Sequence, residues 1–181
     1  MNKKNIILDL DNTLVNSLTF KELNVLSKSK EKKFKYVDMD KSYRVFWRPH
    51  LQKFLDYLFE NFNVSVWSMA SLSYVAFIVK NIILIKPERK LDFVFFAYHC
   101  SYSKRFLKCA KDVRILWNEL KLVGYNTDNV YIIDDLPEIY KTLPKHTIKA
   151  EYFDILTPNS ENDVFLLDTI KRLEKIRKDT E

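Results

Sequence analysis

The chain has 181 residues, of which 47% are hydrophobic and 14% aromatic, so it can bury one core and is not largely disordered. Its apolar runs are too short for a secretory signal or a membrane span, and its two cysteines form no C-x-x-C pair, so we expect an intracellular protein, nuclear or cytoplasmic, without a zinc site. The net charge of +6 favours anionic partners such as phosphopeptides or nucleic acid, with direct nucleic-acid binding the less favoured.

The first predicted strand, Asn5 to Leu10, carries two carboxylates into a turn. The apolar run ends at Asp9, and a second carboxylate, Asp11, and a hydroxyl, Thr13, follow it. A buried strand that delivers two aspartates is typical of phosphoryl-transfer sites, where one Asp is the nucleophile and its neighbour moves protons. A solvated turn after an edge strand would give the same string, so the later elements must separate the two interpretations.

A hairpin and a helix come next in the chain. Lys35 to Val37 and Tyr43 to Trp47 predict a hairpin, inserted over about residues 33–48. Pro49 suits the first turn of a helix, and apolar residues recur at helical spacing from Leu51 to Phe62. The lysine-rich segment before the hairpin is typical of a solvated loop.

The rest of the chain alternates between strands and helices. The expected elements are a strand at Asn63 to Trp67, a helix at Ser71 to Ile85, a strand at Leu91 to Tyr98, a helix at Val113 to Val123, a strand at Asn129 to Ile133 and an amphipathic helix at about residues 162–178. Such alternation predicts an α/β fold with a doubly wound, mostly parallel sheet, in a single domain over residues 1–181.

Polar residues end three of the predicted core strands. These strands end at Asp9, at Ser68 and at Asp134. Ligands of such sheets bind outside the carboxyl ends of the strands, so we expect the three residues to meet at one crevice. Taken singly, Ser68 fits a turn hydroxyl, and the pair Asp134 and Asp135 fits a turn or a helix cap.

The chain contains a single glycine, Gly124. P-loops and G-x-G-x-x-G turns need several glycines so that backbone amides can approach phosphate, so both are excluded. A metal ion, a lysine and a few isolated amides or hydroxyls must then hold the phosphate. The segments between Val15 and Arg48 and between Ser68 and Lys111 are too short for a large cap domain. We therefore expect an open site, suited to a phosphoserine carried on a chain.

Five segments in chain order resemble a known family: DLDNTLV, WRPHLQKFL, VWSMAS, AKDV and VYIIDDLP. They resemble the FCP/SCP-type phosphatases of the haloacid dehalogenase superfamily, the small CTD and NLI-interacting-factor-like enzymes. The resemblance runs from about Asn5 to Asp154, and its R-P-H-L segment is much more specific than D-x-D alone. It implies a haloacid-dehalogenase-like fold without a large cap, and a phosphoprotein phosphatase that acts on phosphoserine in the C-terminal domain (CTD) of RNA polymerase II.

The resemblance also implies roles for single residues. Asp9 would be the nucleophile, which forms an aspartyl phosphate, and Asp11 would be the general acid and base. Lys111 would stabilise charge on the phosphoryl oxygens. Lys104 and Lys108 lie nearby in the sequence and are alternatives for this lysine.

Three further residues complete the implied catalytic site. Ser68 would stand at the hydroxyl position of the second motif, where Thr is common, and Asp134 would orient the lysine. Mg²⁺ would be held by Asp9, by the backbone carbonyl of Asp11 and by Asp135, where the small CTD phosphatases commonly have Asn. Serine in place of threonine keeps the hydroxyl, and aspartate in place of asparagine keeps an oxygen ligand, so both groups that the chemistry needs are present.

Enzymes of this family bind a proline near the phosphoserine in an apolar pocket that the hairpin region forms. In this chain the expected substrate contacts are Thr13 and the apolar side chains Phe20, Phe34, Tyr36, Tyr43 and Leu72. By the two-residue period of strands, we expect Phe34 and Tyr36 to share one face with Tyr43. The alternative is that these rings only pack the hairpin onto the core.

The leading prediction is thus a Mg²⁺-dependent protein serine/threonine phosphatase acting on CTD-like phosphopeptides. One alternative keeps the chemistry but takes a nucleotide, a nucleic-acid end or a small phosphate ester as substrate. Another is a phosphopeptide-binding or scaffold module without turnover. The retained carboxylates Asp9 and Asp11, together with Lys111 and Asp134, favour an enzyme over a scaffold.

Overall fold

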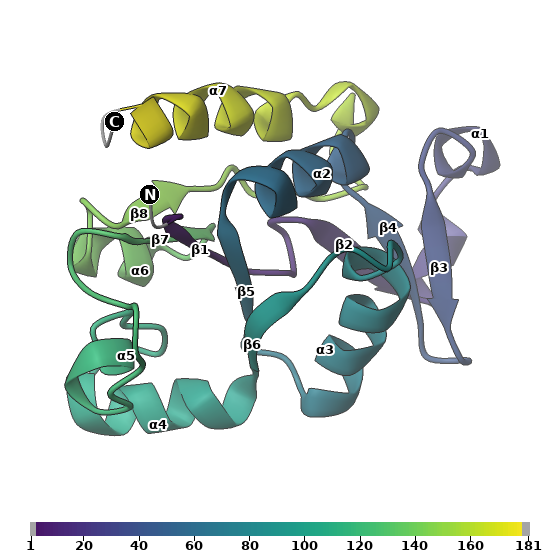
Figure 1. The fold of residues 1–181 in the computed structure, drawn as a ribbon. Helices are drawn as coiled ribbons and strands as arrows, with labels where there is room; N and C mark the ends of the chain where they lie inside the picture. The colour runs from purple at the N-terminus through teal and green to yellow at the C-terminus, as the bar shows by residue number, and fades with distance from the viewer. Residues whose placement is uncertain (1–2, 179–181) are drawn as a thin grey trace. The chain divides into compact units, whose positions relative to one another are not determined.

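The apolar run near the N-terminus forms β1 (Asn5–Leu8), the central strand of a five-stranded sheet in the computed structural model, which describes residues 3–178 (Figure 1). The other strands are β5 (Asn63–Trp67), β6 (Leu91–Phe95), β7 (Val130–Asp134) and β8 (Thr147–Lys149). Their order is β6-β5-β1-β7-β8, and every neighbouring pair is parallel. All four residues of β1 are buried, which explains why Ile6, Ile7 and Leu8 follow one another without an alternating polar residue.

The described chain forms two units by internal contacts, one of residues 3–10 and 58–150, and one of residues 11–57 and 151–178. The parallel sheet belongs to the first unit. Its helical elements are α3 (Leu72–Ile78), the π-helical turn η2 (Val79–Ile83), α4 (Ala97–Leu107), α5 (Ile115–Asn118) and α6 (Pro137–Thr142). Among residues 3–178, no helix has the length and apolar character needed to cross a membrane.

One apolar cluster packs three helices of the first unit against its sheet. Ile7 of β1 and Trp67 of β5 contact side chains that include Cys100 of α4, Leu116 of α5 and Ile139 of α6. All five are at most 5% exposed. Burial of this kind stabilises by roughly 1.5–3 kcal/mol for each large apolar side chain. The cluster therefore holds the strands that carry the polar strand ends.

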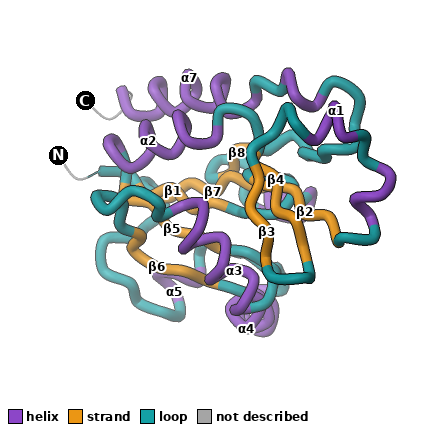
Figure 2. Tube along the Cα trace, turned by 90° about the vertical axis from the view of Figure 1, so that its right-hand side faces the viewer, coloured by secondary structure: helices purple, strands orange, loops and turns teal. Residues whose placement is uncertain are grey.

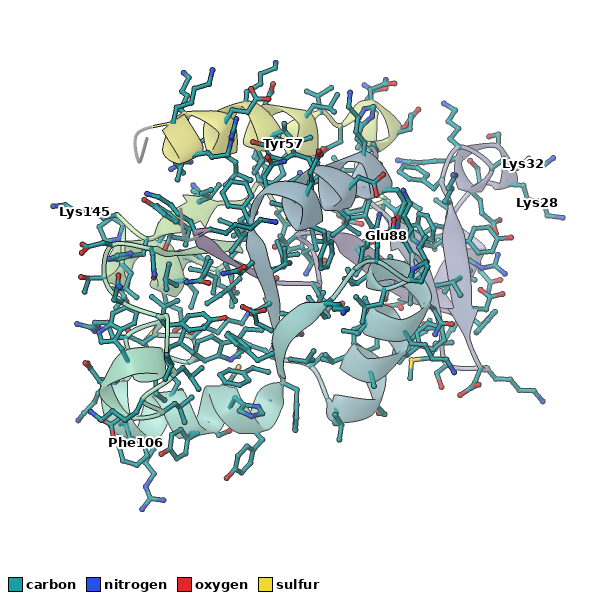
Figure 3. The ribbon with its side chains drawn as sticks, in the orientation of Figure 1. Lys28, Lys32, Tyr57, Glu88, Phe106 and Lys145 are labelled. Atoms are coloured by element: carbon teal, nitrogen blue, oxygen red, sulfur yellow. The ribbon has the colours of Figure 1, made fainter. Side chains whose placement is uncertain are left out.

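The second unit contains an antiparallel sheet of order β2-β4-β3, drawn in orange with the other strands in Figure 2. Its strands are β2 (Val15–Thr19), β3 (Tyr36–Met39) and β4 (Tyr43–Trp47). The helical elements of this unit are η1 (Glu22–Val25), α1 (Lys28–Glu31), most of α2 (Leu51–Asn61), η3 (Ser160–Asn162) and α7 (Phe165–Lys178). The lysine-rich segment includes α1, and Lys28 and Lys32 extend away from the ribbon into solvent (Figure 3).

Most predicted elements are confirmed, and one helix prediction is wrong. The strand at Asn63–Trp67 has the predicted bounds. Only Ile115–Asn118 of the helix expected from Val113 to Val123 is helical, and Lys121, inside the expected range, has a positive φ angle of 52°, which a continuous helix does not allow. The sequence analysis also missed α4 and β2. The C-terminal helix begins at Phe165 instead of about residue 162.

Candidate active site

Three adjacent strands of the first unit carry the polar residues that were expected to converge. Asp9 follows β1, Ser68 follows β5 and Asp134 ends β7, and β1 lies between the other two strands. The amide of Asp9 donates to the carbonyl of Ile133 at 3.0 Å, which continues the β1–β7 ladder to the carboxyl edge. The three side chains therefore stand at one edge of the sheet and are buried, with at most 4% of each exposed.

Lys111 forms hydrogen bonds with both of the carboxylates at these strand ends. Its Nζ donates to Asp9 Oδ1 at 2.5 Å and to Asp134 Oδ2 at 2.7 Å, and its side chain is fully buried. Lys104 and Lys108, the alternatives, are both exposed. The structure thus brings Lys111 to the predicted nucleophile.

Charge and burial act against each other at this cluster. Burial disfavours the Lys111 ammonium, but the charges of Asp9 and Asp134 outweigh it and raise the pKa of Lys111 above its usual value. Burial, with the nearby charge of Asp9, raises the pKa of Asp134, and the Lys111 ammonium opposes this rise. Lys111 is therefore charged at neutral pH, and its charge makes two buried carboxylates at one edge tolerable.

A group of carboxylates suited to a metal ion lies at the same place. Oxygen atoms of Asp9, Asp134 and Asp135 lie within 4.8 Å of one another. Mg²⁺ prefers carboxylate, carbonyl and water oxygens, so this all-oxygen set fits it. The sequence assigned Asp9 and Asp135 to the metal but gave Asp134 only to the lysine, whereas the structure places all three together. The third expected ligand is the backbone carbonyl of Asp11, in the other unit.

Ser68, directly after β5, offers a hydroxyl at the end of the strand next to β1. Its Oγ accepts from the amide of Ala70 at 3.1 Å, and its own amide donates to the carbonyl of Phe95 at 3.0 Å. These contacts fix the backbone at the end of β5 and use the hydroxyl as an acceptor. The hydroxyl proton remains suited to donation toward an anion.

The turn with Asp11 and Thr13 belongs to the second unit, and Arg48 holds it through the carbonyl of Thr13. Arg48, 1% exposed, donates to both carboxylate oxygens of Asp163 at 3.0 and 2.7 Å. It also donates to the carbonyls of Thr13 at 3.0 Å and Glu151 at 2.8 Å. The sequence analysis used R-P-H-L only as a family signature and missed this role.

The register of the hairpin corrects the expected arrangement of its aromatic rings. Tyr36 pairs with Phe46, whereas Tyr43 pairs with Met39, so Tyr36 and Tyr43 lie on opposite faces of the sheet. Phe34 is 8% exposed, and its ring centroid lies 6.4 Å from that of Phe46. Phe34 therefore packs the hairpin onto the core, which supports the alternative interpretation of this ring, and its role as a substrate contact stays a prediction.

The other expected apolar substrate contacts are more open. Phe20, Tyr36 and Tyr43 in the second unit are 39%, 43% and 38% exposed, and Leu72 in the first unit is 55% exposed. Thr13 is fully buried, so its side chain is not at the surface. The sequence analysis also missed Arg44, whose Cζ lies 4.0 Å from the centroid of the Tyr36 ring.

Solved structures show the fold of this chain. The fission yeast RNA polymerase II CTD phosphatase Fcp1, in a variant bound to beryllium fluoride, superposes with a TM-score of 0.56 at 17% sequence identity. The match covers 97% of this chain and 51% of that one, so the chain spans about half of the Fcp1 structure. A likeness at this identity supports the haloacid-dehalogenase-like α/β fold that the sequence predicted.

Sequence comparisons show the family. The chain is 41% identical to the CTD phosphatase-like protein 355R of Invertebrate iridescent virus 6, over 91% of this chain and 93% of that protein. It is 39% identical to the protein of the same name from Invertebrate iridescent virus 3, over 97% of each. The family model for NLI interacting factor-like phosphatases matches residues 4–181. With these matches over nearly its whole length, the chain belongs to the NLI interacting factor-like phosphatases and is an enzyme of that class.

Proposed function

We propose that this protein is a Mg²⁺-dependent phosphoserine phosphatase that acts on CTD-like phosphopeptides through an aspartyl phosphate. The main observation in support is the contact of Lys111 with Asp9, at the carboxyl edge of the parallel sheet. A buried ammonium beside a carboxylate lets two anions, nucleophile and phosphate, approach each other. The iridescent virus relatives and Fcp1 carry CTD phosphatase names, which supports a phosphoprotein substrate.

In the first half-reaction, an oxygen of Asp9 attacks phosphorus in line with the departing serine oxygen. The bond from phosphorus to that oxygen breaks while Asp11 protonates it, and Asp9 carries the phosphoryl group. In the second, Asp11 takes a proton from water, which attacks phosphorus and releases inorganic phosphate from Asp9. Lys111 and the Ser68 hydroxyl stabilise charge on the equatorial oxygens in both steps.

Mg²⁺, held by Asp9, the Asp11 carbonyl and Asp135, would supply positive charge between nucleophile and phosphate. Asp134 lies within the same carboxylate group and in contact with Lys111, so its role is to orient the lysine. Removal of either Mg²⁺ or the Lys111 ammonium should therefore leave the phosphate close to several carboxylates without enough positive charge.

A substrate panel tests the proposed function. We expect hydrolysis of CTD-like phosphoserine peptides with a kcat/KM at least about tenfold above that of nucleotides and sugar phosphates, since an open site gains binding energy from a peptide chain. Release of inorganic phosphate from each substrate is the measurement. A preference for nucleotides or small esters would replace the peptide assignment, and no turnover of any substrate with Mg²⁺ present would indicate a binding module.

We expect chelation to abolish activity and added Mg²⁺ to restore it. Without a cation, Asp9, Asp11 and Asp135 repel one another and the phosphate. Asp135→Ala should lose activity because it lacks a ligand atom, whereas Asp135→Asn, the matched control, should keep much of it through its amide oxygen. Phosphate release is followed with and without excess EDTA. Undiminished activity in EDTA would contradict the metal requirement.

The hairpin register allows a sharper test of substrate binding. Tyr43 lies on the face opposite to Tyr36 and is 38% exposed, so we expect it to contact the peptide. Tyr43→Ala should raise KM for a Ser-Pro phosphopeptide about three- to tenfold, because an aromatic contact contributes roughly 0.5–1.5 kcal/mol. Hydrolysis of a small aryl phosphate should change little.

Two further variants separate recognition from folding. Tyr36→Ala changes the other face and should leave KM for the peptide near that of the wild type. Phe34→Ala should instead lower the free energy of unfolding by about 3–5 kcal/mol, because the ring is buried in the core. Equal losses on peptide and aryl phosphate in Tyr43→Ala would mean that this ring supports the fold and does not bind substrate.

A further inference from the structure

Lys111 lies on an irregular connection between two helices. Helix α4 ends at Leu107, followed by Lys108 in the left-handed conformation with φ of 62°, and α5 begins only at Ile115. The ammonium of Lys111 nevertheless contacts both Asp9 and Asp134. A long side chain holds such a position only if the backbone that carries it is fixed.

The side chain of Ser103, in α4, fixes this backbone on both sides of Lys111. Its Oγ donates to the carbonyl of Cys109 at 2.8 Å and accepts from the amide of Asp112 at 3.1 Å. Ser103 is fully buried, as are Lys111 and Asp112. One hydroxyl thus uses its donor and an acceptor site to close the segment from 109 to 112, with Lys111 inside it.

Asp112 links the same segment to the next helix. Its Oδ1 accepts from the amide of Arg114 at 3.0 Å and from Arg114 Nε at 2.9 Å. The residue whose amide donates to Ser103 is therefore itself held at the start of α5. Ser103 thus connects α4 to the 109–112 segment, which Asp112 holds at the start of α5. The hydrogen bonds that make this connection are directional and buried.

We propose that Ser103 is a positioning residue that holds Lys111 between Asp9 and Asp134. This inference rests on the proposed function, in which Lys111 stabilises the phosphoryl oxygens. Ser103 itself touches none of the reacting groups in the described structure; its hydroxyl contacts only the backbone of Cys109 and Asp112. Loss of this hydroxyl leaves two buried backbone groups unpaired, and the 109–112 segment shifts.

We expect Ser103→Ala to lower kcat by about ten- to a hundredfold with little change in KM, since small misplacements of a catalytic group have effects of this size. Thr147→Val is the matched control: it removes another buried hydroxyl of the first unit, which donates to the carbonyl of Leu143 at 2.8 Å. Thr147→Val should keep the kcat of the wild type. If Ser103→Ala does not fold, Ser103→Cys retains a weaker donor and acceptor in the same place and carries the comparison.

A double-mutant cycle shows whether Ser103 acts through the lysine. In a Lys111→Met background, Ser103→Ala should change kcat less than about twofold, because the group that it positions is gone. An equal loss in both backgrounds would overturn the proposal, since Ser103 would then act on something else. Unchanged kcat in Ser103→Ala alone would overturn it as well.

Nuclear magnetic resonance of the lysine ammonium supplies a readout that needs no activity. The protected Nζ resonance, assigned to Lys111 by its loss in Lys111→Met, should shift or broaden in Ser103→Ala but not in Thr147→Val. An unchanged resonance in Ser103→Ala would contradict the positioning role. If the wild type hydrolyses no phosphate ester, the proposed function fails, and the resonance still decides whether Ser103 holds Lys111.

Discussion

Asp9→Asn is expected to lower kcat by at least about 10⁴-fold, the scale found when a nucleophile is removed from an enzyme. The amide is a poor nucleophile, so no aspartyl phosphate forms, although its shape and place at the end of β1 are kept. Phosphate release from a phosphoserine peptide is the measurement. Beryllofluoride, which mimics an aspartyl phosphate, should inhibit the wild type and bind weakly to the variant.

Two other Asp-to-Asn changes are the controls for Asp9→Asn. Asp11→Asn should also be severely impaired, because the amide cannot exchange a proton, but the variant should still bind substrate and trap a complex. Asp135→Asn should remain active. Hydrolysis by Asp9→Asn at the rate of the wild type would refute the covalent mechanism, and loss in all three variants alike would point to folding instead of chemistry.

The parallel sheet could be predicted because its three central strands, β1, β5 and β7, are largely buried. Asn63 to Trp67 contains two valines and a tryptophan and is followed by the polar Ser68, and its predicted and observed bounds agree. The carboxyl edge follows from the same reasoning, since parallel strands end together and their next residues must be neighbours. Asp9, Ser68 and Asp134 could therefore be grouped from the sequence.

Helix α4 could not be predicted from its residues. Its sequence, AYHCSYSKRFL, is rich in Tyr, His, Cys and Ser, which have only moderate or poor helix propensity. Burial of Cys100 in the core and the bonds of Ser103 stabilise this helix, and both are tertiary effects. Because α4 was not predicted, the sequence could not show which of Lys104, Lys108 and Lys111 lies beside Asp9.

The faces of the hairpin depend on register, which the sequence leaves open. Met39 and Tyr43 close the turn, with three residues between them. A shift of one residue in this pairing would move every side chain of a strand to the opposite face. Alternation along one strand could be predicted, but which residues of two strands share a face is decided by the turn.

Arg48→Ala is expected to lower the free energy of unfolding by about 3–5 kcal/mol, because it leaves Asp163 without its buried partner. Arg48→Lys should lose most of the same amount, since a single ammonium cannot reproduce the planar, bidentate fork or reach both carbonyls. Arg44→Lys is the control, because Arg44 forms a more exposed ion pair with Asp38. It should lower the free energy of unfolding by no more than about 1 kcal/mol. Urea unfolding of each variant is the measurement.

Because Arg48 also donates to two carbonyls, removing both charges of the Arg48–Asp163 pair should not restore the full free energy of unfolding. Replacing a buried ion pair by apolar residues is often neutral, so Arg48→Met with Asp163→Leu should recover part of the loss. Recovery should stay incomplete, because the carbonyls of Thr13 and Glu151 each lose a donor at a cost of about 1–3 kcal/mol. Full recovery would mean that these carbonyl bonds contribute nothing. An Arg48→Lys variant as stable as the wild type would show that charge alone is enough, and would refute Arg48 as the anchor of the turn that carries Asp11.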